Sequence, residues 1–74
     1  MPDPLADRRL VNTLREARTR LGLTQAELAF RVGVSRKTVN TVENGVFTPS
    51  TLLALKLAAA LGRPVEALFR IERD

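Results

Sequence analysis

The 74-residue chain contains no cysteine, histidine, tryptophan or tyrosine. The absence of cysteine excludes disulfides and thiolate metal ligands, and the absence of histidine removes the commonest metal ligand and most nucleophile–base pairs. No stretch reaches the roughly 18 apolar residues of a membrane span, and the first ten residues lack the apolar core of a signal peptide. We therefore expect a cytoplasmic protein with no cofactor, no metal and no membrane contact.

Acidic residues are also few, eight in all, and they do not cluster at the spacing of a metal site or an acid–base pair. There is no glycine-rich phosphate loop. A chain of this length buries only roughly 60% of the surface that it exposes when unfolded, which leaves little room for a catalytic cavity. The sequence therefore predicts that the protein is not an enzyme.

Positive charge, by contrast, is in excess. Twelve Lys and Arg residues give a formal net charge of +4 and an isoelectric point near 11.1. This balance suits a polyanionic partner such as nucleic acid, although a general preference for arginine is the alternative explanation.

Helix signals are dense along the chain and strand signals are nearly absent. Thr24 and Glu27 have the spacing of a capping box, Ser35 and Ser50 can each cap a helix, and Gly33 suits a tight turn. Five helices are expected, at residues 7–21, 24–32, 35–44, 51–61 and 64–70. The fold class predicted is all-α, a single compact domain over residues 1–74.

The third expected helix has a narrow apolar face, with Val39 and Val42 at its centre. Polar side chains occupy the opposite arc: Arg36, Lys37, Asn40, Thr41 and Asn44. A helix joined to its predecessor by a short turn can lie in the DNA major groove. There an Arg or Lys can reach guanine, Asn can pair with adenine, and Thr can meet a thymine methyl or a phosphate. A merely solvated face is the alternative.

The run "LREARTRLGLTQAELAFRVGVSRKTVNTVENG", continued by "TPS" and "VEALF", resembles the Cro/C1-type (XRE, lambda-repressor-like) helix-turn-helix family over about residues 14–69. The resemblance implies a five-helix lambda-repressor-like fold whose helices 2 and 3 form the helix-turn-helix. It also implies sequence-specific binding of double-stranded DNA by a transcriptional regulator, expected to be a repressor that binds an inverted-repeat operator as a homodimer. Such a protein would be encoded by a bacterium or phage and associate with the nucleoid when bound.

The resemblance assigns Gln25 to a phosphate and to bracing the reading helix, and it places Asn44 and the following loop near the DNA backbone. In that loop many relatives carry Lys or Arg, whereas this chain has Val46 and Phe47. The complete set expected to contact DNA is Gln25, Ser35, Arg36, Lys37, Thr38, Asn40, Thr41 and Asn44.

Two charges fall on or beside apolar arcs, Arg18 in the first helix and Glu43 in the third. Because a partly buried charge without a partner is costly, we expect the two to pair, and the family resemblance implies the same pair. The pair would hold the reading helix against the first helix. Two unrelated surface charges are the alternative.

The fourth helix is apolar almost all round. We expect its core face to include Leu55 and Leu57, and we expect Leu10 and Leu21 on the core face of the first helix. Part of the remaining apolar surface is interpreted as a twofold dimer interface, formed by Leu52, Leu53, Val65, Leu68, Phe69 and Ile71. Alternatively, the fifth helix covers the fourth within one subunit.

A competing function is a protein-interaction module that retains the helix-turn-helix as a scaffold. Phe30, in the second helix, is either a partner contact or a singly exposed apolar residue. An antitoxin-like protein would combine both roles, but so few residues follow the fifth helix that a toxin-binding extension is not expected.

Overall fold

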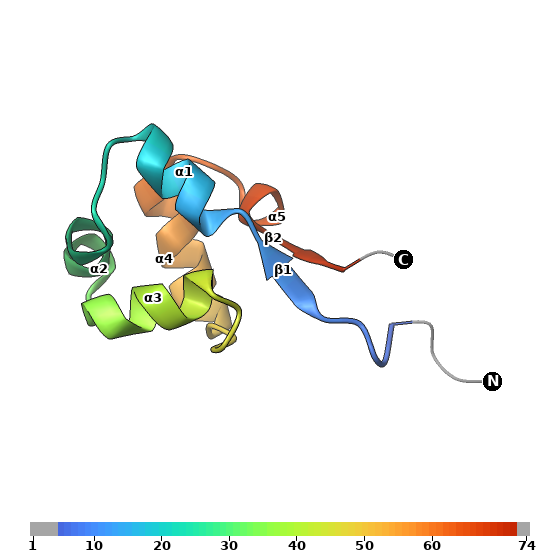
Figure 1. Cartoon of the computed structure of the whole chain (residues 1–74). Coiled ribbons are helices and arrows are strands. Elements are labelled where there is room, and N and C mark those ends of the chain that lie inside the picture. The colour runs from blue at the N-terminus through green and yellow to red at the C-terminus, as the bar shows by residue number, and fades with distance from the viewer. Residues whose placement is uncertain (1–4, 73–74) are drawn as a thin grey trace.

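The computed structural model describes residues 5–72, which form five helices and one two-stranded sheet (Figure 1). The elements in chain order are β1 (Leu10–Asn12), α1 (Leu14–Arg20), α2 (Gln25–Val32), α3 (Arg36–Glu43), α4 (Thr51–Leu61), α5 (Val65–Leu68) and β2 (Phe69–Ile71). Each of the five predicted helices is present, although the first and the fifth are shorter than predicted. The all-α class is wrong in the strict sense, because a small sheet joins the two ends of the described chain.

Helices α2, α3 and α4 begin where local capping predicts. Thr24 accepts from the backbone N–H of Glu27 while the Glu27 carboxylate accepts from the backbone N–H of Thr24, which completes the capping box. Ser35 and Ser50 each accept a backbone N–H three residues further on. These caps satisfy donors that the helices themselves leave unpaired.

The first helix is shorter than the sequence predicts. It begins at Leu14 instead of residue 7, and β1 occupies the last three residues before its cap. The side chain of Asn12 accepts from the backbone N–H of Leu14 at 3.0 Å, and this bond satisfies a donor of the first turn. The predicted helix 64–70 likewise ends at Leu68, where the backbone becomes extended.

The sheet explains both differences. Strands β1 and β2 pair antiparallel, with Leu10 opposite Ile71 and Asn12 opposite Phe69. In Figure 1 this two-stranded ribbon projects from the helical part. Pairing with a distant segment supplies the backbone hydrogen bonds that a helix would otherwise supply.

The core lies where α1, α2, α3 and α4 meet, with α5 closing one end (Figure 1). Leu10 and Leu21 lie outside it, and Leu23, which follows α1, is buried instead. In α4 the prediction of Leu55 was wrong, because Leu55 is 54% exposed while Leu53 is buried. The buried apolar residues are Leu14, Ala17, Leu23, Leu28, Ala29, Val32, Val39, Val42, Leu53, Leu57, Ala58, Leu61 and Leu68.

Candidate nucleic-acid interface

Helices α2 and α3 are joined by the three-residue turn Gly33–Ser35. Gly33 takes the left-handed conformation, with a φ of 76°, which a glycine adopts without the strain that a side chain would cause. Ser35 then starts α3, and its hydroxyl accepts from the backbone N–H of Thr38 at 3.2 Å. The turn fixes the angle at which α3 leaves α2.

One face of α3 is buried and the other is polar and open. Val39 and Val42 are almost wholly buried, whereas Arg36, Lys37 and Asn40 are exposed. These three exposed side chains line one shallow hollow of about 280 Å³. The structure therefore brings together the three long polar side chains of the predicted reading face.

The side chains of other predicted contact residues already make hydrogen bonds within the protein. The hydroxyls of Ser35 and Thr38 lie 3.0 Å apart, and the hydroxyl of Thr41 donates to backbone carbonyls of its own helix. Asn44, just after α3, is exposed, and its side-chain N–H donates to Asn40 Oδ1 at 3.1 Å. These bonds fix the side chains around the exposed face.

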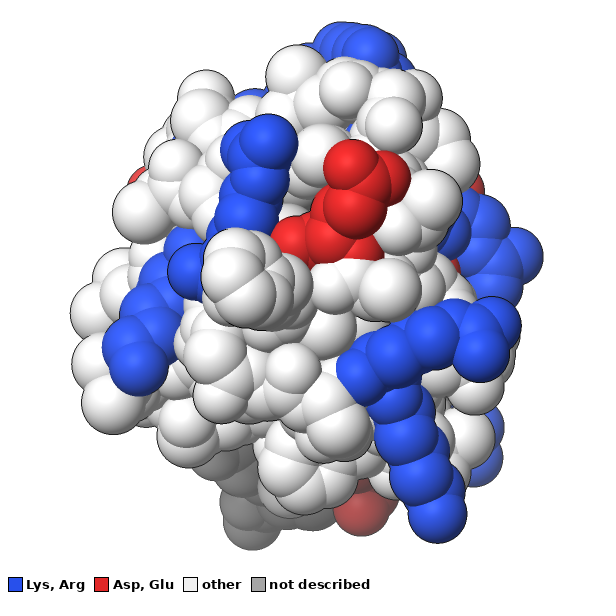
Figure 2. Space-filling model, turned by 90° about the vertical axis from the view of Figure 1, so that its left-hand side faces the viewer, with Lys and Arg blue, Asp and Glu red and all other residues white. Residues whose placement is uncertain are grey.

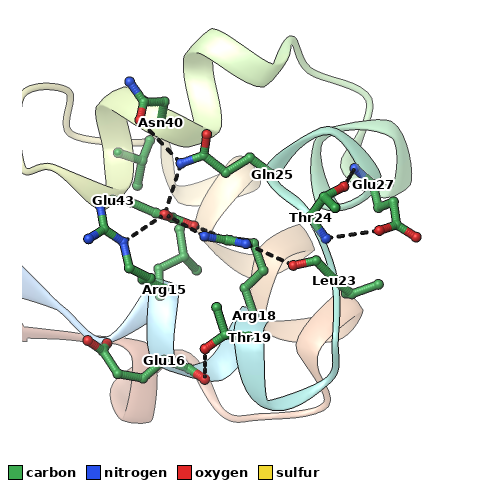
Figure 3. Close-up of polar contacts among 12 residues, drawn as sticks. Arg15, Glu16, Arg18, Thr19, Leu23, Thr24, Gln25, Glu27, Asn40 and Glu43 are labelled. Atoms are coloured by element: carbon green, nitrogen blue, oxygen red, sulfur yellow. Dashed lines mark hydrogen bonds and ion pairs between the residues drawn. The ribbon is translucent and has the colours of Figure 1, made fainter.

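Behind this face, Arg18 and Glu43 form the ion pair that the sequence predicts (Figure 3). Arg18 Nε lies 2.6 Å from Glu43 Oε2, and Arg18 Nη2 lies 3.2 Å from Oε1. Arg18 Nη1 also donates to the carbonyl of Leu23 at 2.8 Å. The Glu43 side chain has no exposed surface. The pair therefore links the end of α3 to α1 and to the segment between α1 and α2.

Two further donors reach the same carboxylate. Gln25 Nε2 lies 3.1 Å from Glu43 Oε1 and 3.2 Å from Asn40 Oδ1, and Arg15 Nε lies 3.4 Å from Glu43 Oε1. Figure 3 shows Gln25 between Glu43 and Asn40, so that the buried pair is joined to the exposed face of α3. In the described chain no buried side-chain nitrogen or oxygen lacks a hydrogen-bond partner.

The hydrogen bonds between these side chains shift the pKa of Glu43 and the pKa of Arg18. Burial raises the pKa of Glu43, but the hydrogen bonds from Arg18 and Gln25, the charge of Arg18 and the bond from Arg15 together outweigh burial, so that the pKa lies below its usual 4.5. The hydrogen bond to Glu43 likewise raises the pKa of Arg18 against the effect of its own burial. Both groups are therefore charged at neutral pH.

This depressed pKa predicts acid sensitivity. Because the folded pKa of Glu43 is below the unfolded value, the unfolded chain takes up the proton first as the pH falls. The stabilisation by the ionised carboxylate is complete above about pH 4.5 and is lost as the pH falls through the folded pKa. In urea titrations, Glu43→Gln should be less stable than the wild type at pH 7, and the gap should narrow below pH 4.5. An equal gap from pH 7 to pH 3 would contradict the assignment.

Sequence reasoning missed two residues of this region, Asn12 and Arg15. Asn12 Nδ2 donates to the carbonyl of Val42 at 3.0 Å, so that one side chain joins β1, the start of α1 and the end of α3. Arg15 lies one turn before Arg18 on α1, and this spacing on one helix face is the signal that identifies it.

Asn12 provides a test of how firmly α3 is held. Asn12→Ala removes one donor and one acceptor, and we expect a loss of about 1–3 kcal/mol in the free energy of unfolding, measured by urea denaturation. Asn12→Asp keeps the acceptor for Leu14, but it replaces the donor to Val42 with a carboxylate oxygen that faces the Val42 carbonyl. Because two acceptors then face each other, we expect this variant to lose at least as much stability as Asn12→Ala at pH 7. Full stability of the Ala variant would show that these bonds contribute nothing.

On the side of the molecule drawn in Figure 2, positive charge does not form one continuous patch. On the face shown in Figure 2, Lys and Arg side chains stand at opposite edges, with uncharged surface and acidic side chains between them.

Within the part of the chain that the structure describes, no group of three or more acidic, His or Cys side chains could hold a metal ion. None of the helices described is long and apolar enough to cross a membrane.

Comparison with known proteins identifies the class. The family model described as helix-turn-helix matches residues 14–68. A relative described as an uncharacterized HTH-type transcriptional regulator from Methanothermobacter thermautotrophicus is 50% identical over 62 residues, which is 82% of this chain and 90% of the relative. A similarly described regulator, YgzD of Bacillus subtilis, is 41% identical over 63 residues, 85% of this chain and 96% of the relative.

A solved structure of another regulator is also similar to this chain. The restriction-modification controller protein C.AhdI from Aeromonas hydrophila superposes with a TM-score of 0.70 at 44% identity, over 73% of this chain and 82% of that one. The chain belongs to the Cro/C1-type (XRE) helix-turn-helix family of DNA-binding transcriptional regulators. This confirms the family resemblance seen in the sequence.

Proposed function

We propose that the protein is a sequence-specific reader of double-stranded DNA, with α2 and α3 as its helix-turn-helix and α3 in the major groove. The observation that carries the proposal is the construction of α3: its apolar face is only two valines wide, its opposite face exposes Arg36, Lys37 and Asn40, and its end is anchored by the buried Glu43. A helix that enters a groove must expose donors and acceptors and keep a fixed orientation.

The proposed roles follow from side-chain chemistry. Arg36 and Lys37 have the donors for guanine O6 and N7, and Ser35 at the start of α3 is placed for a phosphate. Asn40 Oδ1 already accepts from Gln25 and Asn44, so that its orientation is set before DNA arrives. Gln25 is proposed to brace this residue and to contact a backbone phosphate. Thr38 and Asn44 border the same surface.

We further propose a homodimer that represses transcription from an inverted-repeat operator, with half-sites about 10–10.5 bp apart or a multiple of that spacing. Leu52 is 63% exposed and Ile71 is 49% exposed, and both remain candidates for the interface, together with the half-buried Val65 and Phe69. A dimer bound across a promoter would exclude the polymerase. The site of action would be the cytoplasm.

Two members of the predicted interface require correction. Leu53 and Leu68 lie in the core of the protomer, at 9% and 1% exposure. Leu53 lies on the side of α4 that faces the core, and α4 is so evenly apolar that the sequence does not show which side this is. Leu68 lies on the side of α5 that faces the core. Neither side chain is free to contact a second copy.

A protein-interaction role is the second candidate, and Phe30 is the observation that favours it. Its side chain is 86% exposed, and it lines an open groove of about 630 Å³ together with Arg31, Lys56 and Ala59. An apolar ring beside two cations suits an acidic, partly apolar segment of another protein. This surface shares no lining residue with the hollows on α3.

Selection from a random duplex DNA library by the purified protein, at near-physiological salt, separates the two functions. Recovery of an inverted repeat with half-sites one helical turn apart is the expected result. If folded protein enriches no sequence, DNA reading is contradicted and the interaction role becomes the better explanation. Phe30→Ala serves as a control, because it should leave the recovered operator unchanged.

A further inference from the structure

Two large apolar side chains stand exposed directly after α3, beside its polar face. Val46 is 78% exposed and Phe47 is 47% exposed. Neither belongs to the core or to the apolar residues packed against it. Both side chains stand next to the proposed reading face. DNA bases bound at that face would therefore lie beside apolar surface as well as polar side chains.

The backbone holds these two residues against the last turn of α3. The N–H groups of Val46 and Phe47 both donate to the carbonyl of Thr41, at 2.9 and 3.1 Å. The preceding Gly45 has a φ of 73°, which allows the chain to turn back at this point. The two side chains therefore leave from fixed positions and do not depend on a freely moving loop.

The hydroxyl groups of the two neighbouring threonines already make hydrogen bonds within the protein. The Thr41 hydroxyl lies 3.0 Å from the carbonyl of Lys37 and 3.0 Å from that of Thr38, and the Thr38 hydroxyl lies 3.0 Å from the Ser35 hydroxyl. Both hydroxyls thus have partners within the protein, and the methyl groups are the parts of these side chains left without one.

These residues border one open hollow of about 330 Å³, lined by Lys37, Thr38, Thr41, Val46 and Phe47. We call it the methyl pocket. Its lining is mostly apolar, and Lys37 is the one charged residue among the five that border it. A ligand that fits it presents a small apolar group next to a site of negative charge.

We propose that the methyl pocket receives the 5-methyl groups of thymine in the operator, and this inference rests on the proposed DNA-reading function. The thymine methyl is the largest apolar group that base pairs present in the major groove, and phosphates or guanine acceptors close by suit the Lys37 ammonium. Lys37 and Thr41 are four residues apart and so share one side of α3. Val46 and Phe47 thereby become specificity-determining residues.

The test compares thymine with deoxyuridine, which keeps the base pair and lacks only the methyl group. In the operator recovered by selection, each thymine of a half-site is replaced in turn, and the dissociation constant is measured. We expect a loss of about fourfold for each buried methyl at one or two positions per half-site, since burial of one such group contributes roughly this factor. The same replacement elsewhere in the half-site should have no effect.

Variants then assign the effect to the pocket. With Val46→Ala and Phe47→Ala, the ratio of affinities for thymine and deoxyuridine at those positions should fall toward one. Phe30→Ala, which removes an exposed phenylalanine from α2, should leave the ratio unchanged.

Three results would overturn the inference. They are an operator without thymine in its half-sites, equal binding of every deoxyuridine duplex, and a methyl effect that persists in both pocket variants. In each case tight, selective binding of the operator would leave the proposed function standing. Failure to enrich any operator would instead remove the proposed function, and with it this role for the pocket.

Discussion

Replacing Arg18 by Met is expected to lower the free energy of unfolding by about 3–5 kcal/mol, because the substitution leaves the buried Glu43 carboxylate without its main partner. A 74-residue domain has roughly 4–11 kcal/mol in total, so this loss removes a large part of its stability. Urea denaturation at pH 7 measures it. Arg20→Met, an exposed arginine at the end of the same helix, is the matched control and should change stability little.

The loss should depend on pH. Without Arg18, burial of Glu43 is opposed by fewer bonds, so that the pKa of the carboxyl rises and the group is protonated more readily in the fold. The deficit of Arg18→Met relative to the wild type should therefore shrink on acidification. If Arg18→Met were as stable as Arg20→Met at pH 7, the pair would not hold α3 in place.

Removing the two cations of the reading face should have the largest effect on DNA. Arg36→Ala combined with Lys37→Ala is expected to weaken operator binding by at least about a hundredfold, since each base contact is worth roughly 1–3 kcal/mol and the proposed symmetric dimer would lose every contact twice. Titration of a labelled operator by fluorescence anisotropy measures the loss. Both side chains are exposed, so the free energy of unfolding should stay within about 0.5 kcal/mol of the wild type.

The control for this pair removes the same charges elsewhere. Arg20→Ala with Lys56→Ala lowers the net charge equally, but both side chains lie outside α3. If binding depended only on the excess of positive charge, the two double variants would lose affinity equally and with the same dependence on salt. A much larger loss for the α3 variant is the result that we expect.

Local signals made most of the helical part predictable. The capping box at Thr24 and the serines at positions 35 and 50 start three helices at the predicted places. Such caps involve residues only three apart, so that they can be recognised without knowledge of the fold. The Arg18–Glu43 pair was also predictable, because each charge interrupts or borders an apolar arc and has to be compensated.

Other features depend on contacts between distant residues. The strands β1 and β2 are three residues each and join positions 10 and 71, which no periodicity within either segment reveals. The inward face of α4 was mispredicted at Leu55 because a helix that is apolar on every side carries no signal for its orientation. The role of Asn12 likewise appears only when α3 is placed beside β1.

If α3 reads base sequence, variants of α3 should select different operators from the same DNA library. The wild type and four single variants, Arg36→Ala, Lys37→Ala, Asn40→Ala and Thr41→Ala, are used to recover sequences from one random library. We predict that at least one variant changes or relaxes the preference at a single base pair, symmetrically in both half-sites, with the spacing retained. Recovery of the wild-type operator by all four variants would contradict the assignment of α3 as the reading helix.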